Sequence, residues 1–307
     1  MQTFSELTKE ELYKDENKTS CCDLAELAGM LLLGSTITYD SIRLVTENGD
    51  VLARLCDLCA KLKIEINMRQ ENDAVSRYTV TIQDKDRIQQ LLCDLELIDS
   101  ATGVIRYVIS PMFTENECCS RAFIKGAFMG GGTVIDPNKN YNLELVTPYL
   151  KLSQQLLELL TKSGFIFKTV QRKSKYVLYT KNSEVILDFL TYVGAYRAQM
   201  ELINIKIEKE IRNDFNRSVN SETANLEKTI AASVKQIQAI EKIDEKIGIE
   251  ELPEELSILA RLRLKHRSIS LNELGMMLNP PLGKSGVNHR FNKIMSIADK
   301  LETKEKS

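Results

Sequence analysis

The sequence has few histidines and no long apolar run, and each shortage excludes a class of protein. Its two histidines, His266 and His289, both lie near the C-terminus. The body of the chain therefore contains no imidazole from which a histidine-based nucleophilic triad could be built. The longest apolar stretch, residues 24–37, contains Glu26 and is too short to span a bilayer. We therefore expect no membrane partner.

The sequence also lacks a secretory leader. Charged residues at Glu6, Lys9, Glu10 and Glu11 occupy the segment where the apolar core of a signal peptide would stand. The seven cysteines are an odd number, and without such a signal we expect them to be reduced thiols. These features predict a soluble cytoplasmic protein.

The cysteines and glycines give no pattern typical of a cofactor site. Cys56 and Cys59 have the spacing of a metal-ligand pair, but a structural zinc needs four ligands, and no second pair so spaced or nearby histidine is present. We predict core thiols there, and packing residues at the pairs 21–22 and 118–119. The glycines at 130–132 follow a predicted helix, whereas a phosphate-binding loop precedes one. No cofactor or metal is expected.

One stretch of the chain occurs twice, and it predicts a duplicated domain. Residues 118–134, CCSRAFIKGAFMGGGTV, match residues 21–37, CCDLAELAGMLLLGSTI, at an offset of 97. Ala25 and Gly29 then align with Ala122 and Gly126, small residues four apart that share one face of each helix. Missing side chains on two helices allow close approach, so we predict that the two copies pack along these helices.

The order of elements within each copy predicts an α+β fold. Each repeat, about 21–99 and 118–196, is expected to run helix, two strands, helix, two strands, helix. The expected strands are residues 36–39, 42–46, 64–69 and 78–82 in the first copy and 133–135, 141–147, 165–170 and 175–180 in the second. A short amphipathic helix is expected before them at residues 4–13.

A change of composition after residue 200 predicts two further regions. We expect a LAGLIDADG-like domain, by the resemblance given below, over residues 1–200, a helical linker over 201–252 and an all-α domain over 253–307. The linker segment from Arg212 to Thr229 is polar and rich in asparagine, and predicts a non-helical joint between two helices.

The last region is basic and predicts three helices. From Pro253 onward there are ten basic against six acidic residues, whereas the preceding part carries 31 against 37, so a polyanion partner is suggested for this end of the chain. Pro253 and a capping box from Ser270 to Glu273 mark the starts of the first two helices, the second over residues 271–278. The third is expected over residues 285–301.

The third helix has the pattern of a DNA-recognition helix. On a helical wheel, Val287, Phe291 and Ile294 share an apolar face, with polar and basic residues opposite. This pattern is typical of a helix-turn-helix recognition helix, although an ordinary bundle with a solvated polar face has it too, and the turn at 279–284 is long. The residues predicted to contact double-stranded DNA are Arg261, Arg263, Ser270, Lys284, Ser285, Asn288, His289, Arg290, Asn292 and Lys293.

The two small-residue helices resemble the LAGLIDADG motif of homing endonucleases, which implies two motif helices at a pseudo-twofold interface and sheets that straddle DNA. In that fold an acidic residue near the end of each motif helix holds the catalytic metal. The matching positions here are Gly34 and Gly131, which offer no oxygen ligand. We therefore expect the fold without nuclease activity, and no catalytic residues.

The whole chain resembles the WhiA family of bacterial sporulation and cell-division regulators. The resemblance rests on residues 120–146, on NRSVNSETANLEKT at 216–229, on IEKIDEKIG at 240–248 and on residues 270–294. It implies a degenerate LAGLIDADG domain joined to a C-terminal helix-turn-helix, and a nucleoid-associated, non-catalytic DNA-binding regulator of cell division and chromosome segregation, with a role in sporulation transcription in relatives. The alternative is a LAGLIDADG-like scaffold that docks a protein partner and binds DNA secondarily.

Overall fold

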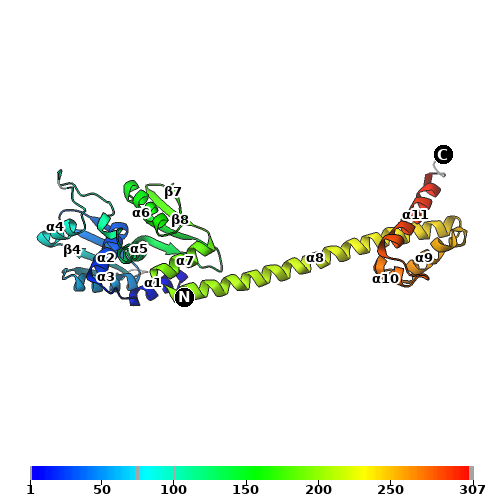
Figure 1. Ribbon diagram of the computed structural model, residues 1–307, viewed down its shortest axis with the longest axis horizontal. Coiled ribbons are helices and arrows are strands. Elements are labelled where there is room, and N and C mark those ends of the chain that lie inside the picture. The colour runs from blue at the N-terminus through cyan, green and yellow to red at the C-terminus, as the bar shows by residue number, and fades with distance from the viewer. Residues whose placement is uncertain (1, 73–75, 100, 304–307) are drawn as a thin grey trace. The chain divides into compact units, whose positions relative to one another are not determined.

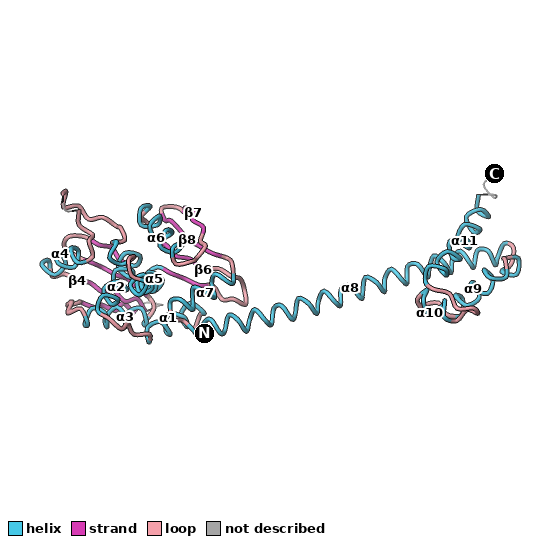
Figure 2. The backbone as a smooth tube through the Cα atoms, viewed as in Figure 1, coloured by secondary structure: helices cyan, strands magenta, loops and turns pink. Residues whose placement is uncertain are grey.

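The computed structural model describes residues 2–72, 76–99 and 101–303, and its contacts divide the chain into two compact units. The first unit ends at Lys209 and the second begins at Glu210. Every strand in the described residues belongs to the first unit (Figures 1 and 2). No helix in these ranges is both long and apolar enough to cross a membrane.

The first unit contains the two predicted repeats, each built around a four-stranded antiparallel sheet. The sheet orders, β1-β2-β4-β3 and β5-β6-β8-β7, are identical in the two copies, which confirms the duplication and the α+β class. The first repeat comprises α2 (Ser20–Gly34), β1 (Ser35–Ile37), β2 (Ile42–Thr46), α3 (Gly49–Lys61), β3 (Asn67–Asn72), β4 (Ser76–Ile82) and α4 (Lys85–Asp94). The second comprises α5 (Glu117–Gly131), β5 (Gly132–Val134), β6 (Leu143–Thr147), α6 (Leu150–Lys162), β7 (Lys168–Arg172), β8 (Lys175–Thr180) and α7 (Ser183–Val193).

The third strand of each repeat begins three residues later than expected, at Asn67 and Lys168. Ile64 and Phe165 lie before these strands and are buried in the core. Their apolar side chains made the loop after α3 and after α6 look like strand, because periodicity alone does not separate a buried loop residue from a buried strand residue.

Helices α2 and α5 pack against each other at the centre of the first unit, with a sheet beyond each of them (Figure 1). A β-carbon added to Gly29 would lie 2.6 Å from the backbone nitrogen of Ala127, and one added to Gly34 would lie 2.9 Å from the carbonyl oxygen of Gly130. Backbone therefore faces backbone across the interface, as the stripe of small residues predicts.

A buried ionic cluster accompanies this close contact. Glu26 of α2, fully buried, accepts two hydrogen bonds from Arg54 of α3, at 2.7 and 2.6 Å. The ammonium of Lys125, on α5, lies 3.1 Å from the same carboxylate and also donates to the carbonyl oxygen of Asp15. Each charge of this cluster thus has an opposite charge and hydrogen bonds, without which its burial would be costly.

Helix α1 (Phe4–Lys14) begins with a capping box between Thr3 and Glu6. The carboxylate of Glu11 accepts hydrogen bonds from the backbone nitrogens of Arg197 and Ala198 and so caps the start of the following long helix. The chain reaches that helix through Gly194, which ends α7 at a φ of +100°.

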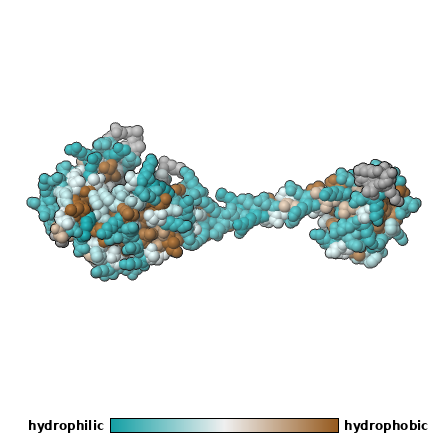
Figure 3. Space-filling model, turned by 90° about the horizontal axis from the view of Figure 1, so that it is seen from above, coloured by the Kyte–Doolittle hydropathy of each residue, from teal (hydrophilic) through white to brown (hydrophobic). Residues whose placement is uncertain are grey.

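The predicted joint in the linker is wrong, because α8 is a single helix from Tyr196 to Lys246. The segment 212–229 contains neither proline nor glycine, and asparagine in a helix costs only about 0.7 kcal/mol relative to alanine. Side chains from 210 to 228 are all exposed, and Figure 3 shows this stretch as mostly hydrophilic. We infer that helix propensity, with little burial, sustains this part of α8.

The second unit has its own apolar core, made by the end of α8, a short 3₁₀ turn (Ile249–Glu251), α9 (Glu254–Lys265), α10 (Leu271–Met276) and α11 (Lys284–Thr303). Ile240 and Ile243 of α8 are completely buried in this core. The core therefore extends upstream of residue 253, where the sequence placed the start of the domain.

Candidate nucleic-acid interface

Helix α11 is buried along one side and exposed along the other. Val287, Phe291 and Ile294 are completely buried, as the helical wheel predicts. From residue 284 to 293 the exposed side chains are Lys284, Ser285, Asn288, His289, Asn292 and Lys293. No acidic residue occurs between Lys284 and Ala298 in the sequence. We call these six exposed side chains the α11 face.

The turn before α11 is held tightly against α10. The backbone nitrogen of Leu282 donates to the carbonyl oxygen of Gly275, and a β-carbon on Gly275 would overlap the carbonyl oxygen of Leu282. Ser270 caps α10, since its hydroxyl accepts from the backbone nitrogen of Glu273 while the Glu273 carboxylate accepts from the Ser270 nitrogen. The longer turn therefore still gives α10 and α11 a fixed mutual orientation.

Arg263 was predicted to contact DNA, and its position excludes this. Its side chain is 1% exposed and lies over the ring of Phe291, with the guanidinium carbon 5.4 Å from the ring centroid. The guanidinium donates to the carbonyl oxygens of His266 and Ile269. Burial also lowers the pKa of Arg263. The residue stabilises the loop between α9 and α10 and cannot reach a phosphate.

Two other predicted arginines already have carboxylate partners. Arg290 is partly buried and lies 2.9 Å from the carboxylate of Glu255 on α9, and Arg261 lies 2.8 Å from that of Glu250. A phosphate would have to compete with these carboxylates. Ser270 is partly buried and is engaged as a cap. The predicted residues that lie together and exposed are those of the α11 face.

The first unit contributes a second basic element, the hairpin of β7 and β8. Lys168 and Lys175 are exposed, and Arg172 pairs with Glu144 at 3.0 Å. All five residues of β7 are exposed. The corresponding strand of the first repeat, β3, carries Arg69 and Glu71, whose charges cancel, whereas β7 carries Lys168 and Arg172.

The ends of the two motif helices have no room for a metal-binding carboxylate. Gly34 and Gly131 are the last residues of α2 and α5. A β-carbon on Gly131 would lie 2.9 Å from the β-carbon of Leu33 and 3.0 Å from the carbonyl oxygen of Val146. Leu32 and Met129, at the other acidic positions of the motif, are buried apolar side chains. The residues present at these positions therefore do not fit a divalent ion.

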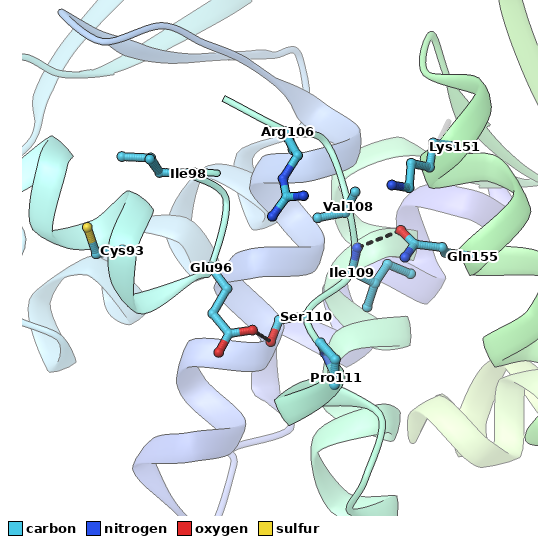
Figure 4. A pocket seen from close by; sticks show the side chains of 10 residues that line it. All are labelled: Cys93, Glu96, Ile98, Arg106, Val108, Ile109, Ser110, Pro111, Lys151 and Gln155. Carbon is cyan, nitrogen blue, oxygen red and sulfur yellow. Dashed lines mark hydrogen bonds between the residues drawn. The ribbon is translucent and has the colours of Figure 1, made fainter. Parts of the chain in front are cut away.

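A cavity of about 550 Å³ lies beside the segment that joins the two repeats, and two hydrogen bonds join residues of its lining (Figure 4). The hydroxyl of Ser110 donates to Glu96 at 2.7 Å, and the backbone nitrogen of Ile109 donates to Gln155 of α6 at 2.9 Å. Arg106 pairs with Asp99. These bonds attach the joining segment to each repeat and give the cavity a structural role.

Comparisons with known proteins agree with the division of the chain into two units near residue 210. A family model of the WhiA C-terminal HTH domain matches residues 215–298, and a model of the WhiA LAGLIDADG-like domain matches residues 36–107 and 120–212. The "Probable cell division protein WhiA" of Alkaliphilus metalliredigens is 40% identical over 97% of this chain and 98% of its own length. The protein of the same description from Ruminiclostridium cellulolyticum is 37% identical, with the same coverage.

Two solved structures share the fold. Full-length DUF199/WhiA from Thermatoga maritima superposes with a TM-score of 0.62 at 26% identity, covering 97% of this chain and 99% of that one. The N-terminal LAGLIDADG domain of DUF199/WhiA superposes with a TM-score of 0.52 at 20% identity, over 63% of this chain and 94% of that one.

Proposed function

The chain belongs to the WhiA family, and on this basis we propose that it is a non-catalytic, DNA-binding regulator of cell division. The observation that carries the proposal is the α11 face, an exposed, acid-free side of a helix that is anchored on the other side by Phe291 and its neighbours. In a helix-turn-helix such a face enters the major groove and lets short polar side chains reach base edges.

Each residue of the α11 face has a definite role in this proposal. Asn288, His289 and Asn292 offer hydrogen bonds to base edges, and Lys284, Ser285 and Lys293 bind phosphates. Arg290 and Arg261 hold α9 and its surroundings through their ion pairs with Glu255 and Glu250, and Ser270 fixes the start of α10 as its cap. A single three-helix module contacts few base pairs, so the basic β7–β8 hairpin supplies a second, sequence-independent contact.

The protein acts in the cytoplasm, at the nucleoid, in chromosome segregation as well as division, and in sporulation transcription where relatives sporulate. It does not cut DNA, because Gly34 and Gly131 replace the metal-binding acids of the LAGLIDADG motif. Incubation of supercoiled plasmid with the protein and Mg²⁺ tests this; cleavage that EDTA abolishes would show a surviving nuclease.

The decisive experiment measures how duplex binding depends on salt. Binding of the full-length protein to fluorescent duplex DNA is followed by anisotropy at several salt concentrations, for the wild type and for Lys284→Ala/Lys293→Ala. Loss of two phosphate contacts reduces the slope of log K against log[salt] by about 2. The matched control, Lys85→Ala/Lys162→Ala, removes the same charge from exposed helix positions of the first unit and leaves the slope unchanged.

If the α11 variant and the control bind alike, the docking proposal is wrong. A second candidate function is then favoured, a scaffold that docks a protein partner. It has its own observation: α8 carries exposed apolar side chains at Ile211, Phe215, Leu226 and Ile230, with exposed fractions from 47 to 67%. These four side chains fall on one side of the helix, the arrangement by which a helix packs along a partner.

A further inference from the structure

The duplication brings four cysteine thiols together at one end of the α2–α5 interface. The two Cys-Cys pairs lie in the first turns of α2 and α5, one pair from each repeat. The Sγ atoms of Cys21, Cys22 and Cys119 all lie within 4.8 Å of one another. The Sγ of Cys118 lies 4.0 Å from that of Cys119.

The expectation that these cysteines are packing residues holds for only half of them. Cys22 and Cys119 are buried, whereas Cys21 and Cys118 are exposed. Exposed vicinal thiols contribute little to packing, so the position of the outer two needs another explanation. The cluster also lies beside a cavity of about 340 Å³ lined by Cys22, Cys118 and Arg121 among others, which gives small ions access to the sulfurs.

The sulfur–sulfur distances among Cys21, Cys22 and Cys119 are close to those of a tetrathiolate metal site. A zinc ion bound to four sulfurs at about 2.3 Å separates them by roughly 3.8 Å. The sulfurs of Cys21, Cys22 and Cys119 exceed this separation by at most about 1 Å, and that of Cys118 is 4.0 Å from Cys119. Rotation of the exposed Cys118 side chain has to bring its sulfur toward the other three. Thiolate is also the ligand that selects zinc over the hard cations, and four sulfurs in tetrahedral arrangement are typical of zinc.

A hydroxyl group contacts the two thiols of α2. The hydroxyl of Thr19, the residue before α2, donates to the Sγ of Cys22 at 3.1 Å and lies 3.2 Å from the Sγ of Cys21. Neither Thr19 nor Asn116 caps its helix with a side-chain hydrogen bond. The Thr19 hydroxyl therefore contacts the two sulfurs and not the backbone of α2.

We propose that Cys21, Cys22, Cys118 and Cys119 bind one Zn²⁺ ion that links the two repeats at the end of their shared helix interface. The ion receives two ligands from each repeat and replaces the thiol protons as it binds. Because ligands come from residues about a hundred positions apart, zinc stabilises the folded first unit and not the unfolded chain.

The test uses full-length protein, fully reduced and kept free of oxygen, titrated with Co²⁺. We expect the visible bands of tetrahedral Co²⁺ and a thiolate-to-cobalt charge-transfer band, with an end point at one ion per chain and displacement by Zn²⁺. The variant Cys21→Ser/Cys118→Ser changes only exposed thiols and is expected to fold, as circular dichroism will check, while its Zn²⁺ affinity falls at least tenfold.

The controls Cys56→Ser and Cys93→Ser alter thiols of α3 and α4, outside the cluster, and keep the full spectrum. Zinc should also raise the thermal midpoint of the wild type and not that of Cys21→Ser/Cys118→Ser. A fully reduced wild type without the charge-transfer band overturns the proposal. So does a band of undiminished intensity in the double variant.

Discussion

A β-carbon on Gly126 would overlap the carbonyl oxygen of Glu26 on the facing helix. The overlap is with backbone, so no side-chain rotation can relieve it. Glu26 is also the residue whose carboxylate holds Arg54 and Lys125, so any shift of α2 at this point would disturb the buried charges as well. Close packing and ion pairing therefore depend on the same few atoms.

Gly126→Ala is accordingly expected to destabilise the first unit by about 4 kcal/mol or more, the range that overpacking against a rigid backbone reaches. Thermal unfolding followed by circular dichroism measures the change as a lower midpoint. Gly49→Ala, at the start of α3, is the matched control, because nothing lies within 4 Å of its added β-carbon. Equal midpoints for the two variants would contradict the backbone contact.

Glu26→Gln tests the buried cluster while preserving side-chain volume. Arg54 and Lys125 would then be buried without a carboxylate between them, and we expect a loss of about 3–5 kcal/mol in the free energy of unfolding. Asp40→Asn removes the carboxylate from an exposed pair, in which Lys85 lies 2.6 Å away, and should cost far less, because water screens the pair. Denaturant unfolding of both variants measures the difference; similar losses would show that the buried pairing is energetically unimportant.

The repeats could be predicted because the signal is local and occurs twice. Small residues at Ala25, Gly29, Ala122 and Gly126 indicate both helices and the faces by which they meet. The burial of Arg54 could not be predicted in this way. Its only explanation is the carboxylate of Glu26, 28 positions earlier, and the single-helix pattern around residue 54 does not contain that information.

The same limit accounts for the errors at the candidate site. Arg261, Arg263 and Lys265 alternate along one basic segment and look equivalent in sequence. Of these three, Arg263 is the one that lies over Phe291, which comes 28 positions later and belongs to another helix. By contrast, the exposure of the α11 face follows from the period of one helix and is confirmed, and its contact with DNA stays a prediction.

The lysine Lys9 should make the stability of the first unit depend on pH. Its ammonium is partly buried and lies 5.7 Å from the centroid of the Phe128 ring. Burial lowers the pKa of Lys9 from 10.5 to about 8, with Glu6 acting in the opposite direction. Between these pH values the unfolded chain binds more protons at this residue than the folded one, so its contribution to stability rises with pH.

Lys9→Met is therefore expected to be more stable than the wild type at pH 7, by on the order of 1–2 kcal/mol, because the ammonium is only partly removed from water. The advantage should decrease as the pH rises from about 8 to 10.5 and the wild-type side chain loses its proton. Denaturant unfolding of both proteins at each pH measures the difference, in which the other titrating groups cancel. A pH-independent difference would contradict the lowered pKa.

The apolar core of the second unit includes the end of α8, and this predicts which C-terminal fragment of the chain folds by itself. Ile240 and Ile243 are completely buried among residues of α9 and α11, and burial of each is worth about 1.5–3 kcal/mol. Their sum is a large part of the 5–15 kcal/mol that stabilises an ordinary domain. The hydroxyl of Ser233, also on α8, donates to the carbonyl oxygen of Arg267, so the loop after α9 depends on α8 too.

We therefore expect a fragment of residues 210–307 to unfold cooperatively on heating, and a fragment of 253–307 to show no cooperative transition. Circular dichroism and dispersion of the amide proton resonances measure both. Residues 210–228 are exposed, so the buried positions from Ser233 onward should account for the difference between the two fragments. The variant Ile240→Ala/Ile243→Ala in the longer fragment tests this. That variant should lose about 4 kcal/mol or more. A cooperative 253–307 fragment with the same midpoint as the longer one would mean that α8 is not part of the second core in solution.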